Sequence, residues 1–433
     1  MAFRAALNTA KHTYRAPEFA VDYVVVGGGV VGLAVARRLS RIPNKTTLLL
    51  ERHSKAGEET SSRNSEVIHS GLYYPPDSLK THLCIRGREL LYAYCKANQV
   101  PFRQTGKLVV ASEKQHGYIE GLHAKAQMLK WPTSFGSATP DRQALPTELI
   151  SGSEARQMEP HLSRDISGAL WCPETGIIDS HALMESLERD IIDSDGADLV
   201  YSTKVVRLDP FKDKPTIDGA KRGWVIQTVT GDEIGSIYTK SVINAMGLSA
   251  PLLVNSLLPE SKRLPLYYAR GSYAKYRGRS VSGISHLIYP CPDNQSHGFQ
   301  SLGTHLTLDL QGEVRFGPDL QWISPKNNDD SDFWKKYLVA DNSRLEEMHQ
   351  AVTKYLPSVE LEGLQPDYVG IRPKLVGPGG GFQDFIFRTD FPDKEVEESA
   401  KRPFISLLGI ESPGLTSALG IAEHVVSNML GEQ

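Results

Sequence analysis

Three glycines near the N-terminus have the spacing of a phosphate-binding loop. Gly27, Gly29 and Gly32 stand in the stretch DYVVVGGGVVGLAVARRL, directly after an apolar run of valines. These glycines would allow a tight turn, a close approach of backbone amides to a diphosphate, and close packing of the next helix on the strand. Glu51 follows about twenty residues later, where a carboxylate accepts hydrogen bonds from an adenosine ribose and repels a 2′-phosphate. The pattern predicts a dinucleotide site and argues against a phosphorylated nicotinamide cofactor.

A second group of chemically useful side chains lies in the polar stretch EETSSRNSEVIHSGLYY, from Glu58 to Tyr74. Its hydroxyl, amide and guanidinium groups could donate hydrogen bonds to a diphosphate and a sugar-alcohol chain. The turn at His69 would then bring an imidazole and a close backbone to the reactive ring of a cofactor. The alternative is a polar surface loop that holds His69 by ordinary hydrogen bonds, and the sequence does not decide between the two.

The elements that position these residues alternate between strands and helices. Residues 24–26 and 46–50 are apolar and predict buried parallel strands, and residues 31–39 between them have helical periodicity. Residues 242–250 predict another buried strand that ends in small residues. Residues 412–416 open an apolar-striped helix whose positive N-terminal end is aimed at the cofactor region. The fold class predicted is α/β, with a doubly wound nucleotide-binding domain.

A second domain is expected because 433 residues exceed the size of about 250 to 300 residues at which single cores stop growing. Strand-like segments at 265–276, 285–290, 301–310 and 313–318 predict an antiparallel sheet, and so an α+β substrate domain. The expected division has three parts: a targeting or disordered segment (1–20), the nucleotide-binding domain (21–85 with 150–260 and 365–433), and a discontinuous substrate domain (86–149 with 261–364).

Composition excludes several classes of partner. A formal charge of -3 provides no reason to expect nucleic acid. The four cysteines lack the spacing of metal ligands or of a disulfide framework, so we expect reduced thiols and no metal site. No apolar run approaches the roughly 18 to 20 residues of a membrane span. Basic residues without an acid before Glu18 favour a mitochondrial presequence over a disordered basic tail.

Seven motifs together resemble the flavin-dependent oxidoreductases of the D-amino-acid-oxidase class, and within it the enzymes that oxidise L-2-hydroxyglutarate. They are GGGVVGLAVARRL with Glu51, NSEVIHSGLYYPPDSLK (64–80), RGSY (270–273), IYPCPD (288–293), GTHLT (303–307), GPD (317–319) and ESPGLTSALGIAE (411–423). The resemblance implies a non-covalently bound FAD, oxidation of L-2-hydroxyglutarate to 2-oxoglutarate, and a mitochondrial location. The chain departs from the pattern at Glu66, where a small residue is frequent, and at Met246, where alanine is usual.

This reaction requires a hydride acceptor, a base and cations for carboxylates. Flavin N5 would accept the hydride from the α carbon, and a neutral histidine, either His69 or His305, would take the hydroxyl proton. Arg372 suits one carboxylate of a small dicarboxylate substrate, because its planar fork binds bidentately. Predicted further substrate contacts are Arg270, Tyr289, Thr307 and Lys374. Predicted cofactor contacts are Gly27, Gly29, Gly32, Glu51, Ser61, Ser62, Arg63, Asn64, Val205, Ala245, Gly247, Gly409, Gly414, Leu415 and Thr416.

Two other functions fit the same residues. One is a flavin-dependent oxidase or dehydrogenase of an amino acid or another 2-hydroxy acid, and the other is a flavin-binding redox sensor without turnover. An enzyme would also need an electron acceptor after the flavin, for which a membrane quinone pool is one candidate.

Overall fold

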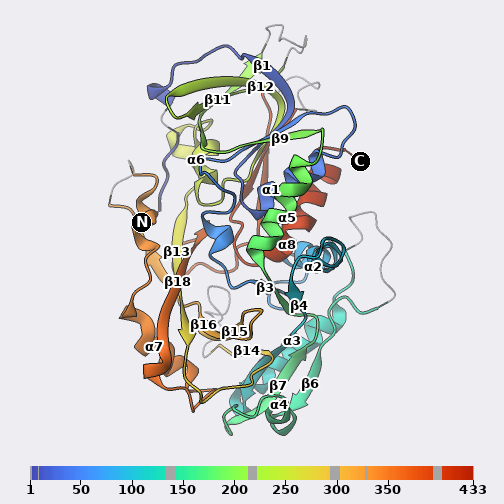
Figure 1. The fold of residues 1–433 in the computed structure, drawn as a ribbon, viewed down its shortest axis with the longest axis vertical. Helices are drawn as coiled ribbons and strands as arrows, with labels where there is room; N and C mark the ends of the chain where they lie inside the picture. Colours follow the sequence, from blue (N-terminus) through green and yellow to red (C-terminus); the bar gives the residue numbers. More distant parts are fainter. Residues whose placement is uncertain are drawn as a thin grey trace.

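The computed structural model describes residues 2–7, 9–132, 142–212, 222–292, 303–326, 330–393 and 402–432. Asp293, the last residue of the IYPCPD motif, and the start of the strand predicted at 301–310 lie outside this described part. Two large sheets organise the molecule, one at each end of its long axis (Figure 1). The cofactor and substrate residues predicted from the sequence are divided between them.

The first sheet has a parallel centre. Strand β1 (Phe19–Val26) pairs in parallel with β2 (Thr47–Leu50) and with β12 (Glu233–Asn244), β2 pairs with β9 (Ala197–Val200), and β12 pairs with β20 (Phe404–Leu408). Antiparallel strands β10 (Thr203–Lys212), β11 (Arg222–Thr230) and β19 (Ile386–Asp390) extend its edges. Strands β2 and β20 are short, mostly apolar and buried along their whole length, as expected of strands that are covered on both faces.

Helices cover both faces of this sheet. On one face α1 (Val30–Leu39) packs against α5 (Ser180–Ile192) and α8 (Gly414–Glu423), and α8 packs in turn on α2 (Leu79–Asn98) (Figure 1). On the other face α6 (Ala250–Asn255) joins a separate apolar cluster with β10 and β11. The α/β fold class predicted from the alternating pattern is confirmed.

The second sheet is mainly antiparallel. Its order is β17 (Gln321–Ile323), β13 (Tyr267–Tyr276), β16 (Val314–Gly317), β15 (His305–Leu308), β14 (Leu287–Pro290), β5 (Lys107–Ser112), β7 (Ile166–Cys172) and β6 (Glu148–Ser151), with β18 (Leu364–Lys374) also beside β13. Helices α3 (His116–Met128), α4 (Gly152–Met158) and α7 (Leu345–Val352) pack on it. A small sheet of β3 (Val67–Ile68), β4 (Phe102–Arg103) and β8 (Gly176–Ile178) lies between the two large ones.

Strand membership differs in places from the division expected from the sequence. Strands β6, β7 and β18 belong to the second sheet, although the predicted boundaries assign nearly all of their residues to the nucleotide-binding part. Conversely, α2 packs on α8, which covers the first sheet, although most residues of α2 were assigned to the substrate domain. The reason is that β7 and β18 find their hydrogen-bond partners on β5 and β13, which lie far from them in the chain.

Three other features bear on the predictions from composition. All four cysteines are buried free thiols. No helix in the described part of the chain combines the length and apolar character needed to cross a bilayer. The segment before β1, expected to be a presequence or a disordered tail, packs on the folded molecule, with Phe3 buried.

Candidate active site

A cavity of about 540 Å³ collects most of the predicted site residues. The carboxyl ends of β1, β2 and β12 form one part of its wall, together with residues 57–61 and 63–65 and strand β10. Strands β14, β15 and β18 of the second sheet contribute side chains to another part, among them Tyr289, His305 and Arg372. Ligands of open parallel sheets bind at this edge, beyond the carboxyl ends of the strands.

The glycine loop has no room for side chains. Gly27 has a φ of +107°, and a Cβ there would lie 2.6 Å from the carbonyl oxygen of Ala245. A Cβ on Gly32 would lie 1.9 Å from the carbonyl oxygen of Gly27. Helix α1 starts directly behind the turn, and its N-cap residue, Gly29, supplies no side-chain acceptor. The first amide, that of Val30, donates instead to Oγ of Ser61 at 3.0 Å. Free amides at a helix N-terminus suit an anionic diphosphate.

Glu51 is held in place at the end of β2 by two backbone amides. Its Oε2 accepts a hydrogen bond from the Gly28 amide at 2.6 Å, and its Oε1 accepts one from the His53 amide at 2.7 Å. Each carboxylate oxygen can accept a further hydrogen bond. Because Glu51 also lines the cavity, it can receive hydroxyl donors from a ribose.

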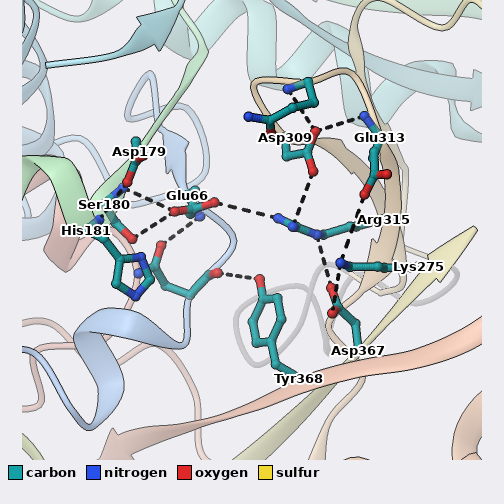
Figure 2. Close-up of polar contacts among 12 residues, drawn as sticks. Glu66, Asp179, Ser180, His181, Lys275, Asp309, Glu313, Arg315, Asp367 and Tyr368 are labelled. Atoms are coloured by element: carbon teal, nitrogen blue, oxygen red, sulfur yellow. Dashed lines mark hydrogen bonds and ion pairs between the residues drawn. The ribbon is translucent and has the colours of Figure 1, made fainter.

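The polar loop, defined here as residues 58–66, is fastened from both sides (Figure 2). Asn64 donates from Nδ2 to the Ser61 carbonyl and accepts from the Glu66 amide at Oδ1, so its side chain shapes the loop itself. Glu66 accepts from the Ser180 amide and hydroxyl at the start of α5. Its Oε2 lies 3.6 Å from Nη1 of Arg315 on β16. The departure at Glu66 thus links the loop both to helix α5 and to strand β16 of the second sheet.

Carboxylate and imidazole groups gather near this link. Glu66, Asp179 and His181 offer ligand atoms within 4.8 Å of one another. The Asp179 carboxylate already caps α5 by accepting from the amides of His181 and Ala182, and Glu66 already faces a guanidinium. Both carboxylates of this group are engaged in holding the fold, so the group does not indicate a metal site.

His69 follows β3 and faces the N-terminal end of α8. Its backbone amide donates to Oγ1 of Thr416 at 3.0 Å, and its Nε2 lies 3.2 Å from Oγ of Ser412. Burial, together with the nearby cation of Lys107, lowers the pKa of His69 to about 3. The imidazole is therefore neutral at physiological pH and able to accept a proton.

His305 lies on β15 with its ring stacked on Tyr289, at 3.8 Å between ring centroids. Its Nδ1 lies 3.0 Å from the Gly303 carbonyl, so Nδ1 is the donor and Nε2 keeps the lone pair. Burial lowers the pKa of His305 to about 3, although the hydrogen bond to Gly303 acts in the opposite direction. Both predicted histidines line the cavity in the neutral form.

Three of the cations that line the cavity lie on β18 and α2. Arg372 lines the cavity and forms no ion pair with any acid in the described part of the chain. Two residues further, on the same face of the strand, Lys374 contacts Glu411 at 2.9 Å, and Lys80 contacts the same carboxylate at 3.1 Å. Burial alone would raise the pKa of Glu411, but the two lysines outweigh it and lower the pKa to about 2. The single carboxylate of Glu411 thus pairs with two lysines. Together with Arg372, they leave this wall of the cavity with a net positive charge.

Comparisons with known proteins agree with this geometry. The sequence profile of the DAO family, FAD dependent oxidoreductase, matches residues 22–427. This chain belongs to that family. A mitochondrial L-2-hydroxyglutarate dehydrogenase of Arabidopsis thaliana is 36% identical over 430 residues, covering 95% of this chain and 83% of the relative. The human mitochondrial enzyme of the same name is 28% identical, covering 94% and 88%, and the Escherichia coli K12 enzyme is 27% identical, covering 94% and 93%.

Solved structures show the same fold. A Mycoplasma pneumoniae L-α-glycerophosphate oxidase with FAD bound has a TM-score of 0.72 at 22% identity, covering 96% of this chain and 95% of that one. Glycine oxidase from Geobacillus kaustophilus has a TM-score of 0.69 at 17% identity, with the same coverage. The resemblance seen in the sequence motifs is confirmed at the level of family and fold.

FAD is the cofactor of this FAD-dependent oxidoreductase, and the cavity fits it. Glycine at positions 27 and 32 permits a turn that a Cβ would block, the N-terminus of α1 lines the cavity, and Glu51 lies at the position expected for a ribose partner. Arg63 lines the cavity, and its Nε is buried without a partner among the described residues. That unsatisfied donor suits a phosphate or a carbonyl oxygen of the cofactor.

The predicted cofactor residues fall into two groups. Those that line the cavity are Gly27, Gly29, Glu51, Ser61, Arg63, Asn64, Val205, Ala245, Gly247, Gly414 and Leu415. Gly32, Ser62, Gly409 and Thr416 are not part of its lining in the described structure. Gly32 and Thr416 act behind the cavity wall, since Gly32 permits the glycine turn and Thr416 holds the His69 amide. Their direct contact with FAD stays a prediction.

Two of the predicted substrate contacts lie elsewhere. Arg270 does not line the cavity: its guanidinium donates to the carbonyls of Tyr337 and Val339 and pairs with Asp341. Thr307 is buried in β15 and is also absent from the lining. The structure therefore differs from the prediction for both residues, because sequence shows the charge or hydroxyl of a residue but not the face on which it lies.

Residues that the sequence reasoning did not assign also line the cavity. They include Tyr73, Tyr74, Lys80, Tyr273, Glu411 and Ser412, all within motifs that carried the family resemblance. Lys107 is missing from those motifs, yet its buried Nζ lies 4.5 Å and 4.8 Å from the ring centroids of Tyr73 and Tyr289. The sequence feature that could have pointed to Lys107 is a single lysine at the start of the apolar run KLVV.

Proposed function

We propose that this protein oxidises L-2-hydroxyglutarate to 2-oxoglutarate in an FAD-dependent reaction. Relatives from a plant, an animal and a bacterium that match over more than nine-tenths of this chain carry the name of this activity. The observation that carries the proposal is the guanidinium of Arg372, which forms no ion pair with an acid in the described part of the chain and lines the same cavity as Lys80, Lys374 and two neutral histidines. This combination suits a dianionic hydroxy acid that must lose a proton.

The bound FAD supplies the acceptor for the hydride that leaves the α carbon. Arg372 binds the carboxylate next to that carbon through its planar fork, which fixes the orientation of the substrate. The second carboxylate lies toward the lysines that share Glu411, because their charge is only partly neutralised. Nε2 of His69 or of His305 takes the proton of the hydroxyl group.

The location and the electron acceptor are part of the same proposal. Mitochondrial plant and animal relatives support a mitochondrial location, whereas the Escherichia coli relative shows that the activity is not confined to that organelle. Electrons must leave the reduced cofactor, and we propose a quinone as acceptor. Reoxidation of the reduced protein by a soluble quinone, compared with reoxidation by oxygen, measures this directly.

An anaerobic reduction screen tests the substrate. Purified holoenzyme is mixed with L-2-hydroxyglutarate, its D enantiomer, other 2-hydroxy acids and a panel of amino acids, and the flavin absorbance is followed. Bleaching by L-2-hydroxyglutarate at low concentration is expected. Bleaching by amino acids alone would show an amino-acid oxidase, and an absorbance unchanged by every compound would show a flavin-binding protein without turnover.

A further inference from the structure

We propose that the N-terminal segment, residues 3–7 with 9–18, forms part of the cofactor site: it closes the adenosine end of the FAD cavity, and Lys11 and His12 contact the cofactor there. The proposal concerns FAD binding, which follows from family membership, and it does not depend on the identity of the substrate.

The start of the segment is anchored on the second sheet. Phe3 is 2% exposed, and its backbone exchanges two hydrogen bonds with Leu266, at 2.9 Å and 2.8 Å. Its ring packs against Tyr268 and Phe333 at 6.0 Å and 6.1 Å between centroids. Figure 1 shows the N-terminus beside this part of the molecule, near α6 and β13. The segment begins as an ordered part of an apolar cluster.

The middle of the segment is held by α6. The Leu7 amide donates to the carbonyl of Leu252 at 3.2 Å, and Asn255 donates from Nδ2 to the carbonyl of Ala5 at 2.9 Å. Asn255 itself is only 1% exposed. A buried side-chain amide that hydrogen-bonds the backbone of the segment would lose a partner if the segment detached, so the attachment is specific.

The last part is held by the first sheet. Arg207 on β10 donates to the carbonyls of Thr9 and His12, at 3.2 Å and 3.0 Å. Gln227 on β11 donates to the Thr13 carbonyl and accepts from the Arg15 amide. The segment therefore reaches from one large sheet to the other, and its first, middle and last described residues all contact the folded molecule.

The contacts with β10 locate the segment at the adenosine end. Glu51 marks the ribose position in this fold, and its carbonyl accepts a hydrogen bond from the Thr203 amide at the start of β10. The pairing of β10 with β11 has a bulge between Val205 and Arg207. A bulge leaves backbone groups without a ladder partner, and here Val205 and its neighbour line the cavity. Arg207, directly after the bulge, holds the segment.

The segment faces the cofactor site with both apolar and polar groups. Ala5, Ala6, Leu7, Lys11 and His12 all line the cavity. The Nδ1 atom of His12 is buried and has no hydrogen-bond partner in the described part of the chain. Buried polar atoms are rarely left unpaired, and the hydroxyls and ring nitrogens of an adenosine would pair this one. The neighbouring residue, Lys11, adds a cation to the cavity lining.

FAD affinity tests the proposal without reference to turnover. The double variant Lys11→Ala/His12→Ala keeps the Phe3 anchor, and the loss of its polar contacts should weaken FAD binding about 10-fold, as measured by flavin fluorescence on titration of apoprotein. His181→Ala is the matched control, since His181 is exposed on α5 and does not line the cavity. Removal of residues 2–12 should weaken binding by about 100-fold or more, because it also removes the apolar wall.

Limited proteolysis provides an independent readout on the unmodified protein. Trypsin should cleave after Lys11 more slowly in the holoenzyme than in the apoprotein, while cleavage after Lys114, which is exposed outside the cavity, should proceed equally in both. If circular dichroism shows that the shortened chain does not fold, the FAD affinity of the double variant decides whether the proposal holds. An unchanged FAD affinity in the double variant, or equal cleavage at Lys11 with and without FAD, overturns the proposal.

The proposal has a consequence for processing. Import into an organelle acts on an unfolded chain, so the segment can carry targeting information and still belong to the folded protein. Cleavage on the C-terminal side of His12 would open the adenosine end of the cavity. Mass spectrometry of the FAD-loaded protein from cells should therefore find Lys11 and His12 retained.

Discussion

Lowering the pH from about 8 to about 5.5 should leave the second-order rate constant for flavin reduction by substrate nearly unchanged. The base has to be neutral to accept the hydroxyl proton, and burial lowers the pKa of both His69 and His305 to about 3. A histidine with that pKa is almost fully neutral at pH 5.5, whereas one with the ordinary pKa of about 6.5 would be only about one-tenth neutral. The two cases differ about 10-fold in rate at this pH.

The measurement is anaerobic stopped-flow reduction between about pH 5.5 and 8, followed by flavin absorbance. The second-order rate constant reports groups of the free enzyme, and carboxyl groups with ordinary pKa values of about 4.3 are ionised in most of a substrate population throughout this range. Retention of FAD at each pH is the control for acid release of the cofactor. A tenfold loss of rate with a midpoint near pH 6.5 would refute the reasoning that burial keeps the base neutral.

Three further changes test the site. Arg372→Lys should raise the dissociation constant of a dicarboxylate about 10- to 100-fold, because a lysine cannot form the bidentate pair, and spectral titration of the oxidised enzyme measures this. Glu411→Gln should lower the free energy of unfolding by about 3 to 5 kcal/mol in denaturant titrations, since it leaves two buried lysines without a counter-charge. In the unmodified protein the stabilisation by Glu411 should be lost as the pH falls from its ordinary pKa of 4.5 to about 2, because the folded state binds this proton less readily. Gly32→Ala should abolish FAD retention after gel filtration, because its Cβ would lie 1.9 Å from a backbone oxygen, while Gly117→Ala, with nothing within 4 Å of the added Cβ, should retain FAD.

The roles of the two histidines are separated by single substitutions. His69→Asn or His305→Asn should slow flavin reduction by about 10² to 10⁴-fold for whichever residue is the base. The other variant should mainly change substrate affinity. Equal and small effects of both substitutions on the reduction rate would exclude a histidine base.

The sequence by itself determined the features that depend on neighbouring residues. The glycine turn was predictable because only glycine tolerates the φ of Gly27 and the close contact at Gly32. The acid at Glu51 was predictable because its distance along the chain follows from one strand, one helix and the next strand. His69 was predictable as a candidate since it follows a donor-rich loop, and the structure places it in the cavity.

Only the tertiary structure decided which charged residues face the site. In the pairing of β13 with β18, Arg372 lies opposite Ala269, and Arg270 lies opposite Ile371. Partners directly across a ladder share a face, and successive residues alternate between faces. The two arginines therefore lie on opposite faces of one sheet, so that Arg372 reaches the cavity and Arg270 holds a distant loop. Register and the packing of distant segments set this choice, and both depend on contacts between residues far apart in the chain.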